Sequence, residues 1–136
     1  MIPFDFVVPG PPVSQQAKNR VRLQLWRDTV RAAAQQRWPT IDAPCGDRLR
    51  ITVVYYHDGE TVRLDNDNML KPIQDALIGL VYEDDRLITD VAVRKTNLNG
   101  RFKIRGLSPV LASGFVLDTE FLYIKIEFAP DHAELP

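Results

Sequence analysis

Four segments of the chain alternate, wholly or in part, between apolar and other side chains, which is the pattern of a strand with one buried face. They are residues 2–8, 48–57, 87–96 and 121–128. Two stretches with apolar residues at helical spacing lie between them, from about residue 20 to 38 and from residue 68 to about 79. This order indicates an α/β fold, a small mixed sheet with two helices packed on it. The Gly- and Pro-punctuated segment 97–118 is interpreted as a long loop, with a short strand around residues 102–104.

Length and composition suit one domain. The chain has 136 residues, of which 45% are hydrophobic and 26% charged. No apolar run approaches the roughly 20 residues that span a bilayer, and the first residues do not resemble a signal peptide. The single cysteine, Cys45, excludes an internal disulfide and fits a reducing compartment. We therefore expect a single domain over residues 1–130, a mobile tail over 131–136, a cytoplasmic location and no membrane partner.

An acidic run at residues 65–77 starts as a polar segment and becomes helical at Asn68. Asp65 and Asp67 are two positions apart, so in an extended segment their side chains project to the same face. Asn68 is expected to cap the helix. Pro72 is then tolerated only if it lies in the first helical turn.

One face of this helix is expected to carry alternating charges. Asp67, Lys71 and Asp75 fall at successive fourth positions, where helical side chains are neighbours. A second acidic segment, with Asp84 and Asp85, follows the helix. Because like charges gathered in this way repel, a cation or a basic partner is expected to offset them.

The acidic run has a simpler interpretation as well. An Asp- and Asn-rich segment before a helix is commonly a turn and a cap with solvated charges. A calcium-binding loop is excluded, because Leu70 stands where that loop needs Gly and Ala76 where it needs Glu. The combination of Lys71 one turn after the acids and a second acidic segment favours a functional site.

The pattern D-x-D-N-x-x-K-x-x-x-D-x-L over residues 65–77, followed by V-Y-E-D-D at 81–85, resembles the RusA family of Holliday-junction resolvases. The Gly/Pro turn at 9–12 and the basic segment 18–22 also resemble that family, and the likeness extends to about Arg94. It implies a RusA-like dimer with a mixed sheet and helices on one side. It also implies a bacterial or phage endonuclease of DNA recombination and repair that cuts four-way junctions symmetrically.

Phosphodiester hydrolysis requires attack by water and neutralisation of the charge that develops on the phosphate, which Mg²⁺ can supply through hard oxygen ligands. We assign Asp65, Asp67 and Asp85 as Mg²⁺ ligands, with Mn²⁺ as a substitute; they match the positions that the resemblance implies are catalytic. Lys71 completes the catalytic set and is assigned to the phosphate, the alternative being a salt bridge within the helix. The supporting candidates are Asn68, Asp75 and Asp84.

The net charge of −1 is not typical of a nucleic-acid-binding protein, but its distribution is uneven. Basic residues gather over residues 18–37. The candidates for contacts with DNA phosphates are Lys18, Arg20, Arg22, Arg27 and Arg31. Their alternative role is a solvated helix face, and Trp26 is expected in the core.

Three other functions stay open at this point. A junction-binding protein that does not cleave would not need the full acidic set. A structural protein would use a cation for stability alone. A nucleotide phosphohydrolase would need a base-sized pocket, and no Gly-rich phosphate loop is present in the sequence. Two features depart from the family resemblance, namely the slightly acidic net charge and the long segment 97–118.

Overall fold

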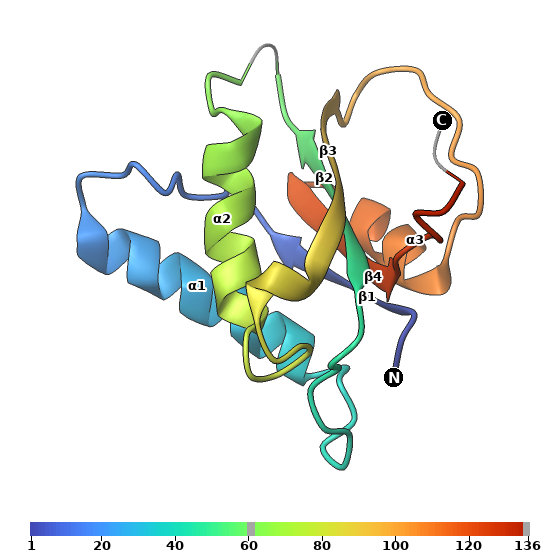
Figure 1. Ribbon diagram of the computed structural model, residues 1–136. Coiled ribbons are helices and arrows are strands. Elements are labelled where there is room, and N and C mark those ends of the chain that lie inside the picture. Colours follow the sequence, from blue (N-terminus) through green and yellow to red (C-terminus); the bar gives the residue numbers. More distant parts are fainter. Residues whose placement is uncertain (60–61, 135–136) are drawn as a thin grey trace.

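The sheet in the computed structural model, which describes residues 1–59 and 62–134, has four strands (Figure 1). They are β1 (Phe4–Pro9), β2 (Leu49–His57), β3 (Ile88–Asn97) and β4 (Phe121–Phe128). Their order across the sheet is β1-β4-β2-β3. The β2–β3 pair is parallel and the other two pairs are antiparallel. The prediction of an α/β fold with a small mixed sheet is therefore confirmed, and β4 has the bounds that its alternation predicts.

The helices are α1 (Arg20–Gln35), α2 (Asn66–Leu77) and α3 (Pro109–Val116), and a short 3₁₀ turn, η1 (Asp85–Leu87), precedes β3. Strand alternation sends one set of side chains, such as Phe6, Val53 and Ile124, beneath α1 and α2, where all three are fully buried. The two helices bury their own apolar stripes against this face. Their buried members are Leu23, Trp26, Val30, Ala34, Met69, Leu70, Pro72, Ile73, Ala76 and Leu77.

α1 begins and ends for local reasons. The side chain of Asn19 accepts a hydrogen bond from Arg22 N and caps the helix. The helix ends at Gln35, earlier than the predicted limit near residue 38, and the chain closes it with a tightened turn in which Arg37 N and Trp38 N both donate to Ala34 O, at 3.0 and 2.8 Å. Trp38 is thereby buried edge-on against Phe4, with ring centroids 5.0 Å apart.

The interpretation of segment 97–118 as a long loop is wrong for its second half, which contains α3. Ser108 caps this helix by accepting from Leu111 N at 3.0 Å, and Pro109 occupies its start, where a missing N–H costs nothing. The helix is short and apolar without a clear helical period, which is why the pattern gave no signal. Residues 102–104, predicted as a short strand, have no regular secondary structure.

α3 covers the sheet face opposite α1 and α2. Its Leu111 and Phe115 pack with Tyr56, Phe121 and Tyr123 in a second apolar cluster. The expectation of two helices on one side therefore needs correction, because the sheet has helices on both faces (Figure 1).

His132, near the end of the described residues, lies beside β3. His132 Nε2 is 2.8 Å from the Asp90 carboxylate, whereas residues 135–136 of the predicted tail lie outside the described residues. The limit of the domain at residue 130 stays a prediction. In the described part of the chain, no helix is both long enough and apolar enough to cross a membrane.

Candidate active site

The acidic run forms the first turn of α2. The helix begins at Asn66, with Asp65 as the extended residue before it, so Asn68 lies inside the first turn and is not the cap. The Asp65 carbonyl accepts the first helical hydrogen bond, from Met69 N at 3.0 Å. Asp67 therefore lies in the first turn, where the exposed N–H groups and the helix dipole favour a carboxylate.

Pro72 lies inside α2, beyond the first turn where it was expected. Proline has no N–H, so the carbonyl four residues earlier, that of Asn68, loses its helical partner. Gln15 supplies the missing donor, because its backbone N–H reaches Asn68 O at 2.9 Å. The loop after β1 is thereby fixed to the first turns of α2. Gln15 is a residue that the sequence interpretation missed, although an orphaned carbonyl four positions before a helical proline is a usable signal.

Lys71 joins the two acidic segments. Its Nζ lies 2.8 Å from an oxygen of Asp75, one turn along α2, and 2.8 Å from Oδ2 of Asp85 in η1. Hydrogen bonds to Asp75 and then Asp85 raise the pKa of Lys71 above its usual value. The same contact with Lys71 lowers the pKa of Asp85. At neutral pH Lys71 and Asp85 are therefore both charged, and Lys71 holds Asp85 against the face of α2.

Asp75 and Asp84 have separate structural contacts. Asp75 lies 3.7 Å from Arg27 Nη2, in addition to its contact with Lys71. Asp84 accepts from Arg86 N at 3.0 Å and so caps η1, which is the turn role that was its simpler interpretation. Neither contact tests the supporting roles assigned to these residues.

Asp65 and Asp67 face solvent at the start of α2. Both are exposed, and neither carboxylate has a hydrogen bond or ion pair with any residue that the structure describes. Asp67 lies one turn before Lys71, on the same face of α2. Lys71 in turn holds Asp85 of η1 against that face. Across residues 1–59 and 62–134, no three Asp, Glu, His or Cys side chains are gathered closely enough to hold a metal ion. The structure thus brings Lys71, Asp75 and Asp85 into contact, while Asp65 and Asp67 stand apart at the start of the helix.

The donors present nevertheless fit a hard cation in kind. Mg²⁺ typically uses one or two protein carboxylates and completes its shell with water and substrate phosphate oxygens. Asp65 and Asp67 offer two carboxylates without partners among the described residues, at a helix end whose dipole alone does not neutralise them.

Comparison with protein-family models gives a match over most of the chain. The model described as Endodeoxyribonuclease RusA matches residues 9–105, a range that contains every residue assigned above to the candidate site and to DNA contact. The chain belongs to the RusA endodeoxyribonuclease family. It is therefore a nuclease that acts on DNA phosphodiester bonds, in a family of Holliday-junction-resolving enzymes that act on branched DNA. No curated protein matches the chain. The matched range of this RusA-family chain stops before α3 and β4.

The basic residues proposed for DNA contact fall into two groups. Arg31 and Arg27 are half-buried against α2: Arg31 Nη1 donates to Ala76 O at 3.0 Å and Ile78 O at 2.9 Å, and Arg27 Nη2 donates to Gln15 at 3.2 Å. Arg31 thus satisfies carbonyls at the C-terminal end of α2 and places a positive charge at the negative end of its dipole.

The other three basic candidates face solvent. Lys18 and Arg22 are exposed, with no side-chain partner in the part of the chain that the structure places. Arg20, also exposed, donates to the Gln15 carbonyl at 3.0 Å. Lys18, Arg20 and Arg22 are therefore the members of the set whose charge remains accessible to a phosphate.

Proposed function

We propose that this RusA-family protein resolves four-way DNA junctions by Mg²⁺-dependent hydrolysis at the N-terminal end of α2. In this proposal Asp65, Asp67 and Asp85 bind the ion and Lys71 contacts the scissile phosphate. The observation that carries it is the bridge from Lys71 to Asp85, which sets the second acidic segment beside the helix face of Asp67. Mn²⁺ is proposed as a substitute cation.

The bound Mg²⁺ would activate the attacking water and neutralise charge on the phosphate. The protein's own contribution is to keep Lys71 charged and positioned. Two carboxylates hold its ammonium, so its charge is maintained well above neutral pH. If the Asp85 carboxylate turns toward a cation, Lys71 keeps its ion pair with Asp75. Two acidic partners therefore allow Lys71 to stay in place while Asp85 binds the ion.

We further propose that the protein acts as a homodimer and cuts symmetrically, in DNA recombination and repair in the cytoplasm of a bacterium or its phage. A two-fold protein presents two equivalent sites to a two-fold substrate. This part of the proposal rests on the family alone.

Cleavage of a synthetic four-way junction and of a matched linear duplex in Mg²⁺ tests the proposal. Wild type is expected to cut the junction at paired positions and to leave the duplex intact. Asp67→Asn is expected to bind the junction and not to cut it, because the amide cannot supply the negative charge of a carboxylate ligand.

Asp47→Asn, an exposed aspartate in the connection before β2, is the matched control and is expected to cut at the wild-type rate. Equal cleavage by Asp67→Asn and Asp47→Asn would remove the proposed metal site. Binding without cleavage by wild type in both Mg²⁺ and Mn²⁺ would make the chain a junction-binding protein.

A further inference from the structure

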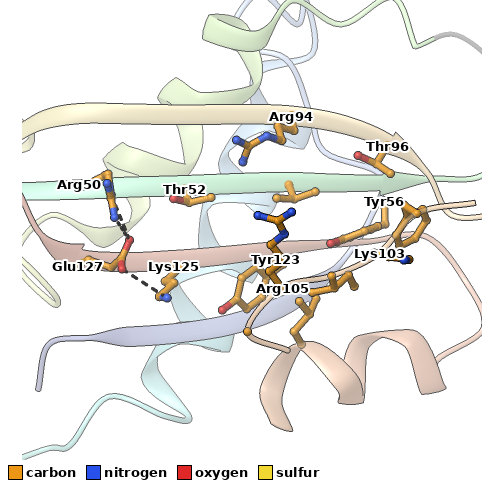
Figure 2. A pocket seen from close by; sticks show the side chains of 15 residues that line it. Arg50, Thr52, Tyr56, Arg94, Thr96, Lys103, Arg105, Tyr123, Lys125 and Glu127 are labelled. Atoms are coloured by element: carbon orange, nitrogen blue, oxygen red, sulfur yellow. Dashed lines mark hydrogen bonds and ion pairs between the residues drawn. The ribbon is translucent and has the colours of Figure 1, made fainter. Parts of the chain in front are cut away.

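The sheet face away from α1 and α2 contains a groove of about 570 Å³ (Figure 2). Side chains of β2, β3 and β4 form its floor, and residues 102–106 of the segment before α3 form a wall. The basic residues that line it are Arg50, Arg94, Lys103, Arg105 and Lys125. Glu127 is the one carboxylate in its described lining. The groove is therefore strongly positive, although the chain has a net charge of −1.

Only part of this positive charge is neutralised within the groove. Glu127 accepts from Arg50 at 2.9 Å and 3.1 Å and lies 3.4 Å from Lys125. Arg94 and Arg105 are exposed, and neither guanidinium group forms a hydrogen bond or ion pair with any residue the structure places. Figure 2 shows Arg94 on the edge strand and Arg105 on the facing loop, on opposite sides of the groove. Unpaired cations around a concave surface concentrate positive potential and attract an anion.

The groove also has the neutral donors that phosphate contacts use. Thr52 and Thr96 present hydroxyl groups from its floor, between the basic side chains. Hydroxyl donors combined with Arg and Lys are the common partners of DNA phosphate oxygens.

The groove and the acidic face of α2 lie on opposite faces of the sheet near the same edge. Arg94 and Thr96 line the groove, whereas Lys95 between them points to the other face, where its Nζ donates to Leu64 O at 2.7 Å, next to Asp65. β3, which carries all three, is an edge strand. One sheet layer therefore separates the two sites, and β3 forms the rim between them.

We propose that this groove binds the phosphate backbone of a second DNA arm while the acidic face of α2 acts on the first, an inference that rests on the proposed function. A straight duplex offers one track and cannot follow both faces of the sheet. A branched DNA has arms that leave in different directions, so one arm can reach α2 while another passes around β3. The groove would therefore add more affinity for a junction than for a linear duplex.

The test measures DNA affinity as a function of salt concentration, without divalent cation so that no cleavage occurs. The proteins are wild type, Arg94→Gln, Arg105→Gln and the double variant. Arg48→Gln is the matched control, since Arg48 is exposed and lies outside the groove. Each lost phosphate contact lowers the slope of log K against log salt by about 0.9. For the junction the double variant should therefore lose about 1.8 in slope, while Arg48→Gln keeps the wild-type slope.

Each outcome decides a separate point. If wild type cuts junctions and the groove variants keep the wild-type salt slope, the groove does not bind DNA. The proposed function would still stand. An equal loss of affinity for junction and duplex would overturn the second-arm assignment. A change in sedimentation without a change in slope would make the groove a contact between two copies of the chain. A wild type that neither binds nor cuts a junction would overturn both proposals.

Discussion

Replacement of Arg31 by methionine is expected to destabilise the fold and to leave DNA binding largely unchanged. Nη1 of Arg31 donates to Ala76 O at 3.0 Å and Ile78 O at 2.9 Å, at the end of α2. Methionine retains much of the apolar stem but has no donor and no charge, so both carbonyls lose their partner.

The size of the effect follows from these contacts. A hydrogen bond from a charged group contributes ~1.5–3 kcal/mol, and a cation at a helix C-terminus adds ~0.3–1 kcal/mol. Because a single nitrogen serves both carbonyls, we count less than two full bonds and expect the free energy of unfolding to fall by about 2–3 kcal/mol. For a domain of this size, that loss lowers Tm by roughly 6–15 °C.

Urea unfolding followed by circular dichroism measures this loss. Arg22→Met is the control on the same helix, because the exposed side chain of Arg22 forms no hydrogen bond or ion pair within the described residues; its stability should change by less than about 0.5 kcal/mol. DNA binding should change in the opposite way. Arg22→Met should have a lower salt slope than wild type, and Arg31→Met should keep the wild-type slope. Wild-type stability of Arg31→Met, combined with a reduced salt slope, would refute the structural role of Arg31.

Two further predictions concern the contacts around α2. Gln15→Pro removes the N–H that Asn68 O accepts beside Pro72, so it should cost ~1–3 kcal/mol more than Gln15→Ala, which keeps that N–H; equal urea midpoints for the two variants would show that the bond contributes nothing. Because Lys71 lowers the pKa of Asp85, the stabilisation by that carboxylate is present above the ordinary carboxyl pKa of about 4 and is lost as the pH falls through the lower folded-state value. The stability difference between wild type and Asp85→Asn should therefore shrink on acidification, and a difference that stays constant from pH 7 to pH 2 would contradict this reasoning.

The strands were predictable because their signal is local. In β4, apolar side chains alternate with charged ones from Ile124 to Glu127, and the apolar set lies in the core beneath α1 and α2. α3 gave no such signal, because eight mostly apolar residues have too little contrast between faces to define a helical period. Its position is set by tertiary packing of Leu111 and Phe115 on the sheet.

Only some of the contacts around the candidate site could be predicted from the sequence. The spacing of Lys71 and Asp75 gave their ion pair directly. The contact of Lys71 with Asp85 and the engagement of Arg31 with the end of α2 depend on how separate segments meet. The start of α2 differed by two residues because Asp65, although it has no side-chain capping bond, adopts the extended conformation that precedes a helix.

The proposal that the face of α2 is the cleavage centre is tested most directly by the single-turnover cleavage rate of Lys71→Met on a four-way junction, with enzyme in excess so that binding does not limit the rate. Loss of a group that stabilises charge in the transition state typically lowers the rate ~10²–10³-fold. We expect a loss of that size with junction affinity changed only a few-fold, and unchanged cleavage by Arg48→Gln in the same assay. Cleavage by Lys71→Met at the wild-type rate would contradict the account.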